Sequence, residues 1–584
     1  MSIARLLAAT IIALSFLYPI PSTLTPTLAV VDPLRSPNNK FGIHIISPTS
    51  EEINAAAELV NSNGGDWGYV TFLIENKDRN KDKWQQFFNN LRQLKLIPIV
   101  RIATQPEQDF WKKPDENEAE IWAKFLNSLD WPVKNRYVVI YNEPNHGQEW
   151  GNSVDARSYA RVLNQTIDAL KQKSEDFFVL NAGFDASTPE ERPSYQDQLT
   201  FMREMNDEVP DIFNKLDGWA SHSYPNPGFL GSPLDFGRRS IRGYLWELEV
   251  LKNLGVSKNL PVFITETGWK HSDGKNFNPR YPSPETIAGY YKYAFENVWS
   301  DYRIVAVTPF LLNYQDYPFD HFSFKKIRGA SSTQVLGAEY PEFHPHYITL
   351  ASLNKPNGKP RMRRSAQLTD GSVYHSIVAN EEYTIPLTFK NVGQSIWNND
   401  DPVRLIAIEG GKELGVEDVE IPKAFRIEPG KEFTFNIRLK APSNGAYKLV
   451  LNLFDGNDQF DTEAFEFETQ VKSPVSLKIK SKLKWKDSAA GDYFLKLYTV
   501  LGDQIQKITL NDSGQSQPLE AKFLLPDYTF EYTLEKDYYK PKTIRQTVQS
   551  GENILDFGTL EPDFLSTIFN LKAFWGLLPL SKQI

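Results

Sequence analysis

Between residues 42 and 345, short apolar runs alternate with longer stretches in which apolar residues recur at helical spacing. Eight runs have the β-branched and aromatic content of strands, and they lie at 42–46, 67–74, 96–103, 136–143, 177–184, 216–223, 261–267 and 304–312. The stretches between them, such as EEINAAAELV, are amphipathic. Strand and helix units in this succession predict an α/β fold in which residues 41–345 form a (β/α)8 TIM barrel. An open, doubly wound sheet is the alternative for the same pattern.

After residue 345 the apolar spacing changes to a period of two, which is typical of half-buried strands. The basic stretch KPNGKPRMRR, with its prolines and glycine, predicts a linker that we assign to 346–371. Apolar and polar residues alternate in YTIPLTF, FTFNIRL and YKLVLNL, which predicts an immunoglobulin-like β-sandwich at 372–472. The same alternation in LKIKSKLKW and YTFEYTL predicts a second small β-domain at 473–562.

Both ends of the chain are apolar. Arg5, a following apolar run and small residues up to Ala29 are typical of a signal peptide at 1–29, and an uncleaved anchor is the alternative. The tail at 563–584 contains Asn570 and Lys572 and falls short of the run of about 20 apolar residues that a membrane span needs. We expect a terminal helix that packs on the preceding domain. The alternative is an interfacial helix that attaches the chain to a membrane or cell surface.

Composition narrows the classes of function. The 584 residues include no cysteine, so packing alone must stabilise the exported protein, which favours a secreted, extracytoplasmic or cell-surface location in a bacterium. The net charge is −9 with both signs interspersed, which excludes the basic surface that nucleic acid requires. The sequence has no Gly-rich phosphate loop and no Ser nucleophile elbow, and its eight histidines form no metal-like pattern with neighbouring acids. We therefore expect no cofactor and no metal, and no pattern indicates an oligomeric state.

Two glutamates stand at the ends of predicted strands that lie across the mouth of the expected barrel. Asn142-Glu143-Pro144 ends the fourth run and Glu266, in FITETGW, ends the seventh. Because the active site of such a barrel is built at the carboxyl ends of its strands, we expect these side chains to face one space. Two carboxyl groups suffice to hydrolyse a glycosidic bond, one as proton donor and one to meet the positive charge on the anomeric carbon.

These residues resemble clan A of the glycoside hydrolases, the cellulase-like retaining (β/α)8 enzymes, over about residues 41–345. The resemblance implies that Glu143 is the general acid/base, that Glu266 is the nucleophile and that Asn142 binds the sugar's 2-hydroxyl. The sixth run continues as SHSYPNPG, which is similar to the His-x-Tyr of clan members. By that similarity Tyr224 donates a hydrogen bond to Glu266 and His222 lines the subsite; the alternative is that both only close a tight loop.

Further candidates follow from the chemistry of sugars, whose apolar faces stack on aromatic rings. Trp269, just beyond Glu266, is the first candidate platform, followed by Trp111, Trp150 and Tyr314; for each of them taken singly, packing is the favoured alternative. Many clan members carry a tryptophan where this chain has Tyr314. Arg101, near the end of the third run, is expected either to bind a hydroxyl or orient Glu266, or to form an ordinary ion pair.

The sequence therefore predicts an exported retaining glycoside hydrolase acting on a carbohydrate, with β-linked bonds as the expected substrate. One alternative is a carbohydrate-binding or adhesion protein that holds polysaccharide on a barrel scaffold without cutting it. Another is a cell-surface structural protein in which the β-domains matter most. The trio of Asn142, Glu143 and Glu266 favours the enzyme, because binding alone does not require it.

Overall fold

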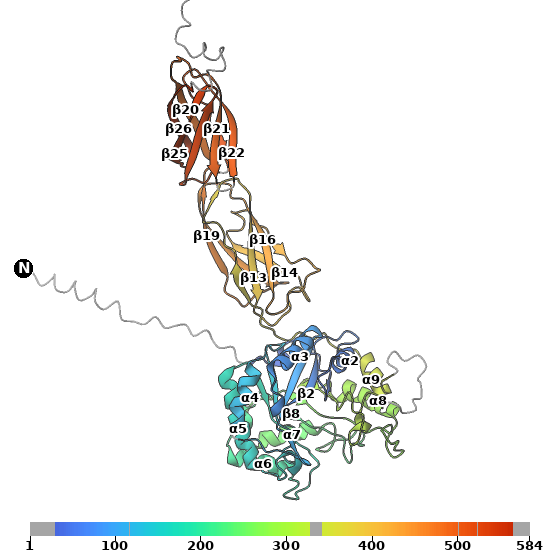
Figure 1. Ribbon diagram of the computed structural model, residues 1–584. Helices are drawn as coiled ribbons and strands as arrows, with labels where there is room; N and C mark the ends of the chain where they lie inside the picture. Colours follow the sequence, from blue (N-terminus) through green and yellow to red (C-terminus); the bar gives the residue numbers. More distant parts are fainter. Residues whose placement is uncertain (1–29, 116, 328–341, 500–501, 523, 564–584) are drawn as a thin grey trace, which may run out of the picture. The chain divides into compact units, whose positions relative to one another are not determined.

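The computed structural model describes residues 30–115, 117–327, 342–499, 502–522 and 524–563 (Figure 1). The predicted signal peptide at 1–29 and all but the first residue of the predicted tail at 563–584 lie outside the described residues. The chain divides into two compact units between Arg363 and Arg364. In the part of the chain that is described, we find no helix with the length and apolar character needed to cross a membrane.

The first unit is built around two parallel sheets. The strands of one are β1 (Gly42–His44), β2 (Gly68–Glu75), β3 (Leu96–Ala103), β6 (Arg136–Ile140) and β7 (Phe177–Leu180), paired in that order. The strands of the other are β8 (Trp219–Ser221), β9 (Val262–Ile264) and β10 (Ile304–Val307). Isolated parallel bridges pair Leu180 with Gly218 and Phe41 with Val307. All eight predicted runs thus contain a parallel strand, and consecutive strands are neighbours.

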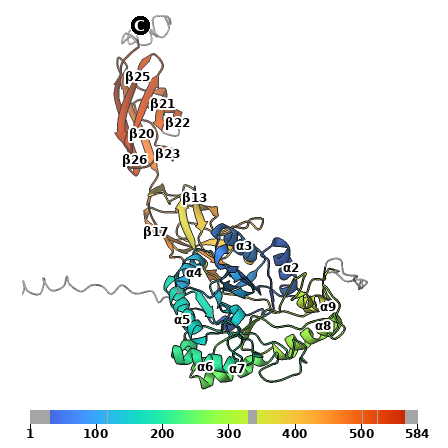
Figure 2. The same cartoon turned by 60° about the horizontal axis from the view of Figure 1, so that its bottom comes forward.

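Helices follow the strands along the chain and lie around the outside of the sheets (Figures 1 and 2). They are α2 (Ser50–Val60), α3 (Lys81–Gln93), α4 (Glu118–Asn127), α5 (Ala156–Lys173), α6 (Gln198–Glu208), α7 (Gly243–Asn253), α8 (Pro284–Tyr293) and α9 (Pro345–Ser352). Many begin at a polar N-cap: the side chains of Thr49, Asn80, Asp155, Asp197 and Ser283 each accept a hydrogen bond from a backbone N–H of the first turn.

Shorter elements complete this unit. They are the hairpin of β4 (Pro106–Glu107) and β5 (Phe110–Trp111), the 3-10 turns η2 (Pro33–Arg35), η3 (Asn76–Asp78), η4 (Gly147–Glu149), η5 (Ile212–Lys215) and η7 (Asp320–Phe322), and the π-helical turn η6 (Ala294–Val298).

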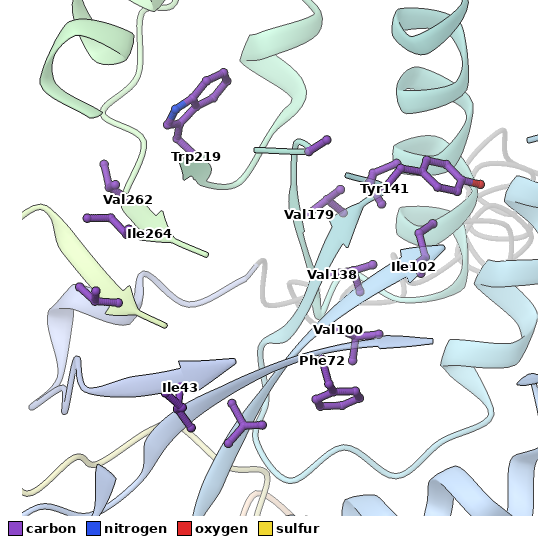
Figure 3. Close-up of a cluster of buried hydrophobic side chains, with 14 of the residues drawn as sticks. Ile43, Phe72, Val100, Ile102, Val138, Tyr141, Val179, Trp219, Val262 and Ile264 are labelled. Carbon is purple, nitrogen blue, oxygen red and sulfur yellow. The ribbon is translucent and has the colours of Figure 1, made fainter. Parts of the chain in front are cut away.

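Apolar side chains cover both faces of the strands. Figure 3 shows one of the two layers, with residues such as Ile43 of β1, Phe72 of β2 and Val138 of β6. The alternate positions, including Tyr69, Val139 and other buried residues of the same strands, form a separate cluster. Successive side chains of a strand point to opposite faces, so strands with apolar residues at both sets of positions are buried on both sides. This explains why the sequence shows continuous apolar runs rather than alternation.

Regular structure extends further into 346–371 than the linker prediction allowed. Helix α9 occupies the start of that range, because Tyr347 and Leu350 are buried and the Tyr347 hydroxyl donates to the Ala55 carbonyl, 2.8 Å away. Strand β11 (Ala366–Asp370) occupies its end. Within 346–371, residues 353–365 and Gly371 lie in no helix or strand.

The second unit contains β-strands with two separate apolar cores. Around the first core, β11, β13 (Tyr383–Asn391) and β16 (Glu432–Leu439) form one sheet. The other sheet consists of β12 (Ser376–Val378), β19 (Phe465–Lys472), β17 (Gly445–Asp455), β14 (Val403–Glu409) and β15 (Val419–Glu420), with β18 (Asp458–Gln459) pairing with β17. Around the second core, β23 (Leu519–Ala521), β20 (Val475–Leu483) and β26 (Gly551–Leu560) form one sheet. Its second sheet consists of β22 (Gly502–Leu510), β21 (Gly491–Thr499), β24 (Thr529–Lys536) and β25 (Tyr539–Thr547).

Candidate active site

Glu143 and Glu266 both lie just beyond the carboxyl ends of parallel strands, β6 and β9. The chain turns sharply after β6, because Tyr141 and Glu143 have φ angles of 69° and 27°. The Glu143 N–H donates to the Gly183 carbonyl (3.2 Å), and the Glu143 carbonyl accepts from the His146 N–H (2.8 Å). Non-glycine residues adopt such left-handed backbone angles rarely, and mostly where surrounding contacts hold them. Here those contacts aim the Glu143 side chain.

The fold brings Glu143, Glu266 and His222 together. One carboxylate oxygen of each glutamate and a ring nitrogen of His222 all lie within 4.8 Å of one another. His222 Nδ1 is hydrogen-bonded to Glu143 Oε1 at 2.8 Å and lies 3.9 Å from Glu266 Oε2. Glu143 and Glu266 are 79 and 44 positions away from His222 along the chain, yet all three share one site. Catalysis by two carboxyl groups requires such an approach.

Glu266 is held by several polar groups in a nearly enclosed position, with a side chain that is 9% exposed. Arg101 Nη1 donates to Glu266 Oε1 (2.5 Å), the Tyr224 hydroxyl donates to Glu266 Oε2 (3.1 Å), and His44 Nε2 lies 3.8 Å from Oε1. Burial by itself raises the pKa of Glu266, but the charges of His222 and Arg101 outweigh it and lower the pKa below its ordinary value. The surroundings therefore favour the ionised carboxylate.

His222 is buried against a glycine. A Cβ atom on Gly183 would lie 2.0 Å from Cδ2 of the His222 ring, so only glycine leaves room for the imidazole. Burial lowers the pKa of His222, yet the negative charge of Glu266 and the hydrogen bond to Glu143 raise it, and the net shift is upward. Gly183 was not predicted, although a glycine at the end of the fifth apolar run is a signal for close approach.

Asn142 is held by a charged group, since its Oδ1 accepts a hydrogen bond from Arg101 Nη1 (2.7 Å). A further carboxyl group, that of Glu149, belongs to the short turn η4 that follows Glu143. Burial first, and then the charge of Glu143, raise the pKa of Glu149 to about 7. Sequence reasoning did not find Glu149, because its signal is a single acidic residue in a short turn.

His146 and Asp185 form a second pair that sequence reasoning missed. His146 Nε2 lies 2.9 Å from Asp185 Oδ2. Burial lowers the pKa of His146, but the hydrogen bond to Asp185 and the charge of Glu143 outweigh that effect and raise it to about 9. His44 was missed as well: burial lowers its pKa to about 3, so its imidazole is neutral beside Glu266.

Two of the predicted aromatic platforms are buried, and for these the prediction is wrong. Trp269 is 1% exposed, donates its indole N–H to the Gly231 carbonyl (2.8 Å) and packs against Tyr291 with a centroid distance of 5.0 Å. Trp150 is also 1% exposed and packs edge-on against aromatic neighbours. Rings covered in this way present no free face to a sugar.

The other two aromatic candidates are half-buried. Tyr314 packs edge-on against Phe319, with ring centroids 5.4 Å apart, and belongs to an apolar cluster that also includes Tyr224 and Phe310. Trp111 lies in the short strand β5. Phe319, the neighbour of Tyr314, is 39% exposed and was not predicted from the sequence. Of the four aromatic residues predicted as platforms, Tyr314 and Trp111 are the two whose rings are not fully buried.

The three side chains Glu143, His222 and Glu266 could in number and spacing hold a metal ion, which the sequence did not predict. The carboxylates already have partners within the protein, however: Arg101 lies beside Glu266, and His222 lies beside Glu143. Arg101 lies 2.5 Å from Glu266, and a guanidinium that cannot lose its proton would repel a cation at this carboxylate. The arrangement therefore fits the chemistry of paired carboxyl groups better than that of a metal centre.

Comparison with known proteins gives structural similarity only. No family model matches the chain, and no curated protein matches its sequence. Among solved structures, a family 39 glycoside hydrolase from Bacteroides cellulosilyticus WH2 matches with 14% identity and a TM-score of 0.37, over 70% of this chain and 82% of the other. A bacterial orthologue of human α-L-iduronidase matches with 11% identity and a TM-score of 0.34, over 89% and 98% of the two chains. A glucosidase from Croceicoccus marinus matches with 10% identity and a TM-score of 0.39, over 84% and 94%. Glycoside hydrolases are thus among the solved structures to which this chain is similar.

Proposed function

We propose that this chain is a retaining glycoside hydrolase that cleaves O-glycosidic bonds of a polysaccharide or oligosaccharide through a covalent intermediate. The observation that carries the proposal is the approach of the two carboxyl groups, since oxygens of Glu143 and Glu266 lie within 4.8 Å. In retaining enzymes the two groups are about 5–5.5 Å apart, whereas a gap of about 6.5–9.5 Å leaves room for an attacking water. The short approach therefore favours direct attack on the sugar.

In the first step, Glu143 transfers its proton to the glycosidic oxygen while a carboxylate oxygen of Glu266 bonds to the anomeric carbon. The bond between that carbon and the glycosidic oxygen breaks, and the leaving group departs as an alcohol. In the second step, Glu143 takes a proton from water, whose oxygen attacks the same carbon and displaces Glu266. Two inversions at one carbon restore its configuration.

The surroundings of Glu266 support its role as nucleophile. Arg101 and Tyr224 each donate a hydrogen bond to one of its oxygens, which fixes the carboxylate and keeps it ionised. Asn142 adjoins both Arg101 and Glu143, where its amide is suited to hydrogen-bond a sugar hydroxyl. A hydrogen bond to the 2-hydroxyl strengthens in the transition state and so accelerates the reaction.

We also propose that the eight parallel strands close into a (β/α)8 barrel. The bridges from Leu180 to Gly218 and from Phe41 to Val307 support closure, since they connect the two sheets at both edges. The second apolar cluster, formed by the alternate residues of the strands, supports a filled barrel interior. Export of the chain, β-linked substrates and surface attachment through its C-terminal region complete the proposal and rest on the sequence pattern alone.

The test is turnover of aryl β-glycosides and a polysaccharide panel, followed by NMR of the first sugar released. We expect the released sugar to keep its anomeric configuration and Glu266→Ala to abolish turnover. Glu143→Gln should lose less activity on aryl glycosides with good leaving groups than on those with poor ones, because a good leaving group needs no proton. Binding of polysaccharide without any released sugar would instead favour the carbohydrate-binding alternative.

A further inference from the structure

Two segments meet beside Glu143, the turn that follows β6 and the loop that follows β7, and each carries a charged side chain that the proposed mechanism does not use. The Glu143 N–H donates to the Gly183 carbonyl (3.2 Å), two residues before Asp185. The Glu143 carbonyl accepts from the His146 N–H (2.8 Å). His146 Nε2 and Asp185 Oδ2 lie 2.9 Å apart. The segments that carry this pair are thus hydrogen-bonded to both backbone groups of Glu143.

A second connection leads from Asp185 to the carboxyl group of Glu143. Asp185 forms a parallel backbone bridge with His222, whose Nδ1 is 2.8 Å from Glu143 Oε1. Asn145 is fully buried and fastens the loop that carries Asp185, because its amide donates to the Asp185 carbonyl (2.9 Å) and its Oδ1 accepts from the Asp185 N–H (3.2 Å). The position of Asp185 relative to Glu143 is therefore set before any ligand binds.

The pair is an imidazolium and a carboxylate at neutral pH. Burial lowers the pKa of His146, but the hydrogen bond to Asp185 and nearby negative charges raise it to about 9. Burial raises the pKa of Asp185, but the hydrogen bond from His146 outweighs it and lowers the pKa below its ordinary value. The two side chains are 23% and 27% exposed, so a ligand can reach both of them.

Both side chains keep hydrogen-bonding capacity beyond the pair. His146 Nδ1 has no hydrogen-bond partner among the described residues, and in the imidazolium it carries a proton that it can donate. Asp185 Oδ1 accepts from the Ser187 N–H (2.7 Å) and Oδ2 from His146, which leaves a lone pair on each oxygen. Tyr195 packs edge-on against the imidazole, with ring centroids 5.2 Å apart, and holds the ring in place. The pair can therefore donate to one hydroxyl and accept from another.

We propose that His146 and Asp185 bind the sugar of the leaving group, next to the bond that is cleaved. This inference rests on the proposed glycoside hydrolase function. Glu143 gives its proton to the glycosidic oxygen, so the leaving group lies against Glu143, where the pair is attached. Sugar hydroxyls both donate and accept, and hydrogen bonds to charged groups are stronger than those between neutral ones. The pair thus makes cleavage depend on a leaving group that carries hydroxyls.

The test uses three substrates that share one glycone: an aryl glycoside with a good leaving group, one with a poor leaving group, and an oligosaccharide that the wild type cleaves. Asp185→Asn keeps Oδ1 for the Ser187 N–H but loses the negative charge. His146→Phe keeps a ring beside Tyr195 and removes both ring nitrogens. Glu191→Gln is the matched control, because Glu191 is an exposed carboxylate of the same loop.

We expect Asp185→Asn and His146→Phe to lower kcat/KM on the oligosaccharide about 10-fold or more relative to either aryl glycoside, because a charged hydrogen bond to the leaving sugar is lost. Glu191→Gln should match the wild type on all three substrates. If Asp185→Asn does not fold, His146→Phe decides the comparison.

Two patterns of loss would overturn the proposal. A pair that only joins the two segments would lower kcat/KM equally on all three substrates. A pair that acts through Glu143 would lower it as much on the poor aryl leaving group as on the oligosaccharide, since both need the proton. A wild type that cleaves aryl glycosides but no oligosaccharide overturns the proposal as well. A wild type that cleaves no glycoside refutes the proposed function itself, and so the two failures are distinguishable.

Discussion

Replacing Gly183 with alanine tests the geometry of the site directly, because one added methyl group would meet the His222 ring. The new Cβ atom would lie 2.0 Å from Cδ2 and 2.4 Å from Nε2 of His222. Ordinary contacts between carbon atoms begin near 3.5 Å, so the ring must move by more than an ångström. His222 is 2% exposed, and its displacement would break the 2.8 Å hydrogen bond to Glu143.

The magnitude follows from two losses. Overpacking a buried site costs about 1–3 kcal/mol, and the free energy of unfolding should fall by that amount. The lost hydrogen bond leaves Glu143 without its partner, and a misplaced acid/base group typically lowers kcat about 100-fold or more. Gly183→Ala should therefore reduce both the urea midpoint of unfolding and kcat on an aryl glycoside.

Gly289 is the matched control. It lies in helix α8 and is exposed, and a Cβ atom there would have nothing within 4 Å. Gly289→Ala should raise stability by about 0.5–1 kcal/mol, since glycine is a poor helix former, and should leave kcat unchanged. If Gly183→Ala behaves like Gly289→Ala in both assays, the contact between residue 183 and His222 does not exist and the reasoning about the site fails.

Three other changes have defined outcomes. Arg101→Met should raise the pKa of Glu266, so that this carboxylate is protonated at higher pH and the acidic limb of the kcat/KM profile moves upward; an unmoved limb would contradict the assigned contact. Lys355→Met should lower the free energy of unfolding by about 2 kcal/mol or more in urea titrations, because the buried ammonium donates to three backbone carbonyls, whereas the exposed Lys359→Met should have no effect. His344→Gln should flatten the loss of stability between pH 7 and 5 by up to about 2 kcal/mol. Burial lowers the pKa of His344 to about 2, so the native state loses stability as pH falls below the ordinary histidine value, and an equally steep pH dependence in the variant would refute this assignment.

The strands of the first unit were predictable because they are buried on both faces. Runs such as LIPIVRIA carry apolar side chains at successive positions, and the structure has β3 over the same residues, 96–103. The fourth run was predicted to 143 but β6 ends at Ile140, because the positive φ of Tyr141 breaks the strand. Nothing in the residues YNEP specifies that angle.

The sequence indicated which residue types the site needs, but not which side chains pack against each of them in the folded chain. Trp269 follows Glu266 by three positions, and a nearby tryptophan is a reasonable platform until its neighbours are known. Tyr291 and Trp299, from helix α8 and just after η6, cover its ring, and that packing is invisible to local patterns. His44 escaped notice for the same reason, since only the folded chain brings it to within 3.8 Å of Glu266.

The two carboxyl groups differ in their surroundings, and this difference supports the proposed roles without reference to any family. A nucleophile needs a fixed, ionised carboxylate, which the guanidinium of Arg101 and the hydroxyl of Tyr224 supply to Glu266. An acid/base group must exchange protons with the leaving group and then with water, and the Glu143 side chain is 18% exposed where that of Glu266 is 9% exposed. Exchanging the roles would put the proton donor 2.5 Å from a permanent positive charge, which would drive its proton off. The position of Arg101 therefore favours one assignment over the other.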